Sequence, residues 1–201
     1  MPPSGKFVGI DFSQAEVEQL TPDLSKLGQG FRCVRGEFVT YWKQGRIQRE
    51  VDAGISQCWI IKHGNALAGY ITLLADRLEV DEQLLEDEGV QYRTFPAIKI
   101  GLLAADYRAK GAGRRLIEWA LEYVAVELVN AIGVRFMTVD ALYDPDLEPP
   151  YDASSFYEQF GFQFVNPEEE LPPSVPYRTM YLDLKPLIDL LNGQNISDEA
   201  E

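Results

Sequence analysis

Two glycines and several cations follow an apolar stretch near the middle of the chain. Residues 98–116 read I-K-I-G-L-L-A-A-D-Y-R-A-K-G-A-G-R-R-L. Glycine lets the backbone turn tightly and brings its N–H groups close to a ligand. A helix that opens there adds unpaired N–H groups and a partial positive charge, so the pattern predicts a phosphate or pyrophosphate site. We call these residues the glycine loop: Arg108, Ala109, Lys110, Gly111, Ala112, Gly113, Arg114 and Arg115.

The glycine loop differs from two common phosphate-binding patterns. The chain has no Gly-x-x-x-x-Gly-Lys-Ser/Thr segment, and Leu116 stands where the dinucleotide fingerprint requires a third glycine. A plain strand-to-helix turn with solvated cations is the alternative. Cations gathered on a strongly acidic chain favour the binding site.

A tyrosine lies in a second motif downstream. Residues 153–162 read A-S-S-F-Y-E-Q-F-G-F, which predicts a short helix that ends at Gly161. A phenol within hydrogen-bond reach of a leaving group can protonate it as a general acid. Tyr157 is the candidate, and core packing beside Phe156 and Phe160 is the alternative.

Both motifs resemble those of one enzyme family. Arg108-x-x-Gly111-x-Gly113 after an apolar strand resembles the acyl-CoA signature, Gln/Arg-x-x-Gly-x-Gly/Ala, of the GNAT N-acetyltransferases. Residues 153–162 are similar to the Ala-x-x-Phe-Tyr-x-x-x-Gly-Phe helix of that family. The resemblance covers residues 59–184. It implies transfer of an acetyl group from acetyl-CoA to a primary amine of a small or protein acceptor by direct attack, with no metal.

The resemblance also implies roles for individual residues. The strand through Leu102, Leu103 and Ala104 would offer backbone hydrogen bonds to the pantetheine arm, and the amides of residues 109–114 would hold the pyrophosphate. Ser154 belongs to the implied cofactor-binding set. Tyr157 would lie near the thioester sulfur and protonate the departing thiolate.

The general base is the least defined part of the implied site. Many GNAT enzymes carry a Glu on the strand before the signature, whereas this chain has Lys99 and no carboxylate there. Asp140, at the end of the next parallel strand, is the nearest candidate by topology. Glu37 and a chain of water molecules are the alternatives.

Periodicity and turn residues predict the elements that position these motifs. Strands are expected at 6–12, 57–62, 66–74, 95–105, 134–141, 162–165 and 180–184, and helices within 36–52 (split at Gly45) and at 113–130, 153–160 and 185–191. The strand–helix–strand unit around the glycine loop requires a right-handed parallel crossover. The fold class is therefore α/β, a mixed and mostly antiparallel sheet with helices on both faces. The resemblance adds a splayed central parallel pair, a single domain over 1–192 and an acidic flexible tail over 193–201.

Composition limits the partners. Eighteen Lys and Arg against 32 Asp and Glu give a net charge of −14, which argues against a broad nucleic-acid interface and favours a cationic amine. The acidic loop between 144 and 152 would attract such an acceptor. A single His excludes multi-His metal sites, and two Cys favour a reduced, cytoplasmic setting. No run of about 18 apolar residues exists to span a membrane.

Three alternatives to this function stay open at the level of sequence. The first is a non-catalytic acyl-CoA-binding or interaction module, which the missing strand carboxylate allows. The second is a GNAT toxin-like enzyme that acts on aminoacyl-tRNA, and the third is a nucleotide-binding regulator with another α/β fold. The sequence does not fix the oligomeric state; a homodimer is a possibility that the resemblance raises, because GNAT domains commonly dimerise.

Overall fold

A mixed sheet runs through the protein in the computed structural model, which describes residues 6–79 and 82–198. Over that part of the chain, eight strands lie in the order β1-β2-β3-β4-β5-β8-β7, with β6 paired to β5. The strands are β1 (Glu18–Gln19), β2 (Gln57–His63), β3 (Ala66–Glu79), β4 (Thr94–Ala105), β5 (Phe136–Asp144), β6 (Tyr151–Asp152), β7 (Gln163–Phe164) and β8 (Tyr177–Asp183). Only β4 and β5 pair in parallel among the described strands, which confirms the predicted fold class.

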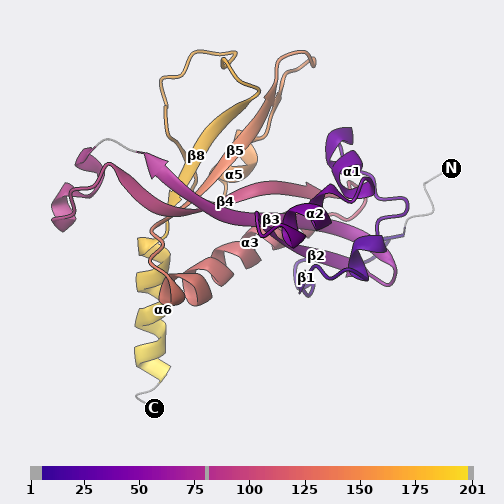
Figure 1. Ribbon diagram of the computed structural model, residues 1–201, viewed down its shortest axis with the longest axis horizontal. Helices are drawn as coiled ribbons and strands as arrows, with labels where there is room; N and C mark the ends of the chain where they lie inside the picture. The colour runs from indigo at the N-terminus through magenta and orange to yellow at the C-terminus, as the bar shows by residue number, and fades with distance from the viewer. Residues whose placement is uncertain (1–5, 80–81, 199–201) are drawn as a thin grey trace. The chain divides into compact units, whose positions relative to one another are not determined.

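The helices follow the predicted order closely (Figure 1). They are η1 (Leu24–Lys26), α1 (Gly36–Lys43), α2 (Arg46–Asp52), η2 (Glu82–Glu88), α3 (Ala112–Tyr123), η3 (Val124–Leu128), α4 (Val129–Ala131), α5 (Ser154–Glu158) and α6 (Lys185–Asp198). Gly45 separates α1 from α2 with a left-handed φ of 62°, which glycine adopts without strain. The helix predicted at 113–130 is α3, continued by the π-helical turn η3 and by α4.

The chain forms two compact units that share β3 and β4. The first unit is Met1–Leu74 with Ile100–Tyr123, and the second is Ala75–Lys99 with Val124–Glu201. Each unit is described below by itself. The prediction of a single domain over 1–192 stays a prediction.

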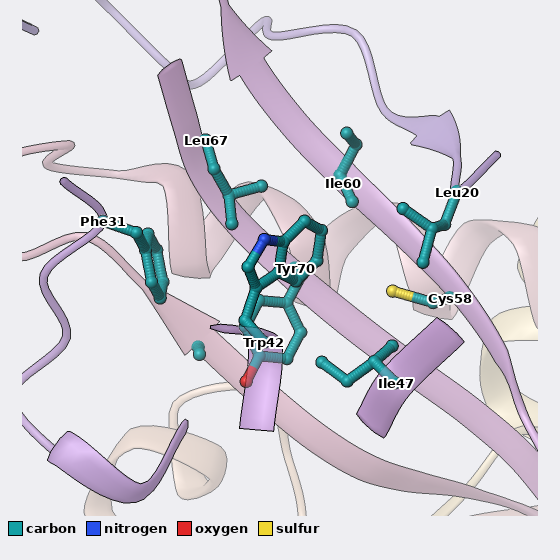
Figure 2. Packing of buried hydrophobic residues seen from close by; sticks show 9 residues of the cluster. Leu20, Phe31, Trp42, Ile47, Cys58, Ile60, Leu67 and Tyr70 are labelled. Carbon is teal, nitrogen blue, oxygen red and sulfur yellow. The ribbon is translucent and has the colours of Figure 1, made fainter. Parts of the chain in front are cut away.

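In the first unit, successive side chains of β2 face different helices. Cys58 and Ile60 are buried in one cluster with Trp42 of α1, seen from close by in Figure 2. Trp59, which lies between them in sequence, packs on Trp119 of α3 with ring centroids 5.0 Å apart. Because neighbouring residues of a strand point to opposite faces, α1 and α3 lie on opposite faces of this part of the sheet.

Two aromatic rings form the centre of that cluster. Trp42 lies against Tyr70 of β3 with ring centroids 5.1 Å apart, and Figure 2 shows the two rings overlapping. The Tyr70 hydroxyl donates a hydrogen bond of 2.9 Å to the carbonyl of Phe38, so its polar end is paired within the core. Helix α1 is thereby fixed to the sheet by both packing and a directed bond.

In the second unit, the core lies between η2 and three strands. The buried side chains that pack together there are Leu78, Leu85, Phe95, Ala97 and Phe136. Phe95 of β4 meets Phe136 of β5 edge to face, with centroids 5.7 Å apart. The parallel strand pair is therefore supported by aromatic packing on this face.

The strand predicted at residues 6–12 is wrong. Residues 6–9 form turns, and Gly9 has a φ of 76°, which no regular strand contains. Phe7 and Phe12 are both buried and meet edge to face, with ring centroids 5.5 Å apart. The apolar residues that suggested a strand instead anchor an irregular segment to the protein.

Helix α6 is longer than predicted. It begins at Lys185, with a proline in its first turn, and continues to Asp198 rather than ending at Leu191. The part of the predicted flexible tail between 193 and 198 is therefore helical, because no proline follows to stop the helix. Residues 199–201 lie outside the described residues. No helix within residues 6–79 and 82–198 combines the length and apolar character of a membrane span.

The close approach of β3 and β4 gives a stability prediction. A Cβ at Gly69 would lie 2.9 Å from the Ala104 carbonyl oxygen and 3.0 Å from Cδ1 of Leu116. We expect Gly69→Ala to lower the free energy of unfolding by about 1–3 kcal/mol in urea denaturation, because a strand must shift. Gly133→Ala is the control, since a Cβ there meets nothing within 4 Å. Equal losses in both variants would contradict this packing.

Candidate active site

The glycine loop begins with a turn of defined geometry in the first unit. β4 ends at Ala105, and the amide of Asp106 donates to the Ala68 carbonyl of β3 at 2.8 Å. The carbonyl of Asp106 then accepts a hydrogen bond of 2.8 Å from the amide of Ala109. Gly111 follows with a φ of 90°, which directs the chain into α3.

Several amides of the glycine loop are left without partners by this turn. Within the described chain, no hydrogen bond engages the N–H groups of Lys110, Gly111 and Gly113. A Cβ at Gly113 would meet only Cβ of Ala105, at 3.5 Å. Unpaired donors at the start of a helix are the groups that bind a phosphate, so the geometry fits the predicted pyrophosphate site.

Asp106 holds the glycine loop together. Its side chain is buried, at 1% exposure of the residue, and its two carboxylate oxygens accept from the amides of Arg32 (2.9 Å) and Arg108 (3.0 Å). The guanidinium of Arg108 adds bonds of 2.7 and 2.6 Å. Burial acts to raise the pKa of the Asp106 carboxyl, but the Arg108 guanidinium and these amides together lower it below its ordinary value.

Arg108 is therefore occupied within the protein. Besides Asp106, its Nη2 donates to the carbonyl of Gly30 at 2.6 Å, and its side chain is 14% exposed. This places Arg108 as a clamp between the glycine loop and residue 30, and its role as a direct phosphate ligand stays a prediction. Sequence reasoning missed Asp106, although a carboxylate two residues before an arginine at a strand end was a usable signal.

The other cations of the glycine loop differ in whether groups of the protein already pair with them. Arg114 pairs with Glu118 one turn later at 2.8 Å, and Arg115 donates from Nε to the carbonyl of Ala15 at 3.1 Å. Lys110 is exposed, and no ion pair within the described residues engages its ammonium. Lys110 is thus the cation of this loop best placed to reach an anionic ligand.

The strand expected to bind the pantetheine arm has a local irregularity. The amide of Leu102 donates a hydrogen bond of 2.8 Å to the Thr72 hydroxyl. A Cβ at Gly101 would lie 2.9 Å from the same hydroxyl oxygen, so only glycine leaves it room. The Leu102 amide is consequently unavailable to a ligand, whereas Leu103 and Ala104 keep their predicted roles as predictions.

Tyr157 lies on α5 in the second unit. Oδ1 of Asp152 accepts a hydrogen bond of 2.8 Å from the amide of Ser154, which stabilises the first turn of this short helix. The Tyr157 ring packs edge to face against Phe156 and Phe162, with centroids 5.4 and 5.7 Å away. Tyr157 thus lies on a helix, and its ring packs on Phe156, as the packing alternative expected, with Phe162 as its second ring partner. Its role as general acid stays a prediction.

The Tyr157 hydroxyl is protonated and unengaged. The residue is 7% exposed, and burial, with a smaller contribution from Tyr151, raises the pKa of the Tyr157 phenol. No hydrogen bond within the described chain involves its hydroxyl. The phenol is thus a neutral donor whose proton is available to a bound ligand.

The carboxylates considered as bases are both paired. Asp140 receives the Lys99 ammonium on Oδ2 at 2.6 Å and the Thr179 hydroxyl on Oδ1 at 3.0 Å. Glu37 accepts from Nε of Arg35 at 2.7 Å. Lys99, which stands on the strand where many GNAT enzymes have a glutamate, is thus the direct partner of Asp140. The role of Asp140 as general base stays a prediction. No cluster of metal-ligating side chains occurs in the described part of the chain.

A comparison with family models decides the identity of the chain. The model described as an acetyltransferase (GNAT) domain matches residues 54–164, more than half of the chain, including the glycine loop and α5. The chain belongs to the GNAT acetyltransferase family. As a member it is an acetyltransferase with acetyl-CoA as co-substrate, which confirms the predicted enzyme class and co-substrate. No match to the chain is found among curated proteins.

Solved structures share the fold. One is AtaT complexed with acetyl-methionyl-tRNAfMet, at 21% identity and a TM-score of 0.71, covering 88% of this chain and 98% of that one. A Tyr-to-Phe mutant of KacT matches at 22% identity and a TM-score of 0.71, with 88% and 99% covered. AtaTR bound with acetyl-CoA matches at 22% identity and a TM-score of 0.66, with 88% and 96% covered. This GNAT chain therefore has the fold of these proteins over most of its length.

The buried Asp106 predicts a pH-dependent stability. Because its folded pKa lies below the unfolded value of about 3.9, its carboxylate stabilises the fold above that pH, and this contribution is lost as the pH falls through the folded pKa. We expect Asp106→Asn to lower the free energy of unfolding at pH 7 by about 1–3 kcal/mol. The deficit against wild type should shrink below about pH 4.

The measurement is urea denaturation at several pH values. Asp23→Asn is the matched control, because Asp23 is an exposed carboxylate paired only with Lys26. A deficit for Asp106→Asn that is the same at pH 3 and pH 7 would contradict the ion pair as its cause.

Proposed function

We propose that this GNAT enzyme transfers the acetyl group from acetyl-CoA directly to a primary amine, with Tyr157 as general acid. The amine nitrogen attacks the thioester carbonyl, the new C–N bond forms as the C–S bond breaks, and the thiolate takes the Tyr157 proton. The attacking nitrogen gives up its own proton to a base. The single observation that carries this proposal is that Tyr157, a buried residue within the family motif, has a hydroxyl that makes no hydrogen bond within the described chain.

The glycine loop supports the co-substrate half of the proposal. The unpaired amides of Lys110, Gly111 and Gly113 would hold the pyrophosphate, while Asp106 and Arg108 keep the loop in shape. Lys110 would add a positive charge near the phosphates. Leu103 and Ala104 would offer the backbone groups for the pantetheine arm.

The two carboxylates predicted as candidates for the general base, Asp140 and Glu37, are both paired, so neither is free to take the proton of the attacking amine. Asp140 would have to release Lys99 before it could accept a proton. We therefore propose that Asp140 and Lys99 act as an ion pair between the middle of β5 and the middle of β4, and that water removes the ammonium proton. Acceptors whose amines are already neutral at pH 7 would then react fastest.

A cationic acceptor suits the second unit. Residues 136–177 contain nine Asp and Glu and no Lys, Arg or His. The negative electrostatic potential of these carboxylates concentrates cations near α5 and speeds their association. A polyamine, a small amine or a basic protein segment fits this surface.

An aminoacyl-tRNA is the second candidate acceptor, and the distribution of charge favours it. The first unit, with the glycine loop, holds 12 Lys and Arg against 10 Asp and Glu, whereas the second holds 6 against 22. The second unit therefore carries a net charge of −16 and the first +2, so the total of −14 does not exclude a nucleic acid from the first. The complex of AtaT, which shares the fold, with acetyl-methionyl-tRNAfMet supports this candidate.

The proposed location follows from chemistry. Cys33 and Cys58 are free thiols, and the co-substrate is itself a thioester, so a reduced cytoplasmic compartment suits both. A homodimer stays a prediction.

Replacement of the Tyr157 hydroxyl tests the general acid. We expect Tyr157→Phe to lower kcat by about 10²–10⁴-fold at saturating acetyl-CoA, because the ring stays and only the proton donor is lost. The affinity for acetyl-CoA, from calorimetry, should change little. Phe160→Tyr, which adds a hydroxyl in the turn just after α5, is the control.

The pH profile adds a second measurement on the same residue. Because burial raises the pKa of Tyr157 above its ordinary value of about 10, ionisation of the phenol should cause no fall in kcat between pH 8 and pH 10. A fall of less than about threefold for Tyr157→Phe would assign Tyr157 to core packing alone.

A panel of acceptors tests the substrate class. Free thiol release from acetyl-CoA is followed with spermidine, a lysine-rich peptide and methionyl-tRNA. If the acceptor is a cationic amine, Asp146→Asn with Glu148→Gln should lower its kcat/KM, and rising ionic strength should lower the wild-type value. If methionyl-tRNA is the acceptor, these two variants should leave kcat/KM unchanged or raise it. No thiol release with any amine would contradict the proposed transfer.

A further inference from the structure

Arg178 of β8 is a buried cation that the proposed chemistry does not use. The residue is 9% exposed and lies opposite Ala141 of β5 in the antiparallel pair. Its guanidinium stacks on the Phe164 ring of β7, 3.7 Å from the centroid. Burial of a cation costs desolvation free energy, so we expect nearby groups to compensate this cost by attractive interactions with its charge.

Two carboxylates face this guanidinium at distances longer than hydrogen bonds. Nη1 lies 3.9 Å from Oδ2 of Asp152, and Nε lies 3.6 Å from Oε2 of Glu169. Nε is buried and has no hydrogen-bond partner in the described chain. Arg178 is therefore held by charge and stacking, and it acts on Asp152, Glu169 and Phe164 together.

These contacts bracket the segment that carries Tyr157. Asp152 lies two residues before the start of α5, and its other oxygen, Oδ1, accepts from the Ser154 amide in the first turn. Phe164 lies two residues after Phe162, whose ring packs on Tyr157. A single side chain on β8 thus contacts both ends of the segment from 152 to 164.

We infer that Arg178 is a positioning residue for Tyr157, which fixes α5 through Asp152 at its start and Phe164 beyond its end. Asp152 keeps the helix in place only while its carboxylate is oriented, and Arg178 orients it by attraction of Oδ2. Phe164 keeps the following strand against β8 by stacking under the guanidinium. The inference rests on the proposed function of Tyr157 as general acid.

A double-mutant cycle tests this inference. In Arg178→Met we expect kcat to fall by about 10–100-fold, since small misplacements of a reacting group cost rates of this order. The KM for acetyl-CoA should change by less than about threefold, because the glycine loop is untouched. In the Tyr157→Phe background, Arg178→Met should cause no further fall. If the two losses multiply in the double variant, Arg178 acts independently of Tyr157 and the inference is wrong.

Two further variants separate positioning from folding. Arg178→Lys keeps the charge but not the planar stack, and should recover only part of kcat. Arg77→Met, which removes an exposed arginine of β3 paired with Glu79, should leave kcat unchanged. Far-UV circular dichroism selects folded variants, and Arg178→Lys carries the test if Arg178→Met does not fold.

A spectroscopic measurement tests the inference without catalysis. With tyrosine labelled at ¹³Cζ, the Tyr157 resonance is the one absent from Tyr157→Phe. We expect the Arg178 variants to shift this resonance and Arg77→Met to leave it in place. An unmoved resonance overturns the inference even if kcat falls. If Tyr157→Phe keeps full kcat, the proposed general acid fails instead, and the resonance still decides whether Arg178 positions the ring.

Discussion

The glycine loop depends on one buried ion pair, that of Asp106 with Arg108. A strand that turns directly into a helix leaves amides unpaired on both sides of the turn. Asp106 removes this difficulty on one side, because its carboxylate accepts from the amides of Arg32 and Arg108 while its backbone stays bonded to β3. The amides on the other side, at Lys110, Gly111 and Gly113, stay open to a ligand. The same pair therefore stabilises the turn and, with it, the arrangement of the amides that stay open.

Local pattern was sufficient for the elements around this loop. Strand β2, with its continuous run of buried residues, and the helical stretch from α3 to α4 are each set by neighbours in sequence, and each was predicted with small errors at the ends. The strand predicted at residues 6–12 failed because their apolar side chains are buried for another reason. Phe7 and Phe12 are buried by contact with each other across a turn, and periodicity alone does not distinguish that packing from a strand.

The candidate site was predictable by residue type but not by pairing. Tyr157 and the loop glycines follow from their motifs, whereas the use of Arg108, the pairing of Asp140 and the role of Thr72 depend on contacts between distant segments. Lys99 shows the difficulty most clearly. In the sequence it marks a missing carboxylate, and in the structure it neutralises the carboxylate that was expected to replace it. A base cannot be assigned from residue type when its partner is set by strand register.

Net charge is the remaining quantity that misleads when it is read from sequence alone. A value of −14 describes a uniform surface only if acids and bases are mixed along the chain. Here 22 of the 32 acids lie in the second unit, while 12 of the 18 cations lie in the first. Screening limits the reach of exposed charges to about 8–10 Å at physiological ionic strength, so a ligand senses the charges near it and not the total. The proposed binding of anionic acetyl-CoA at the glycine loop and of a cationic acceptor near α5 is therefore compatible with the same chain.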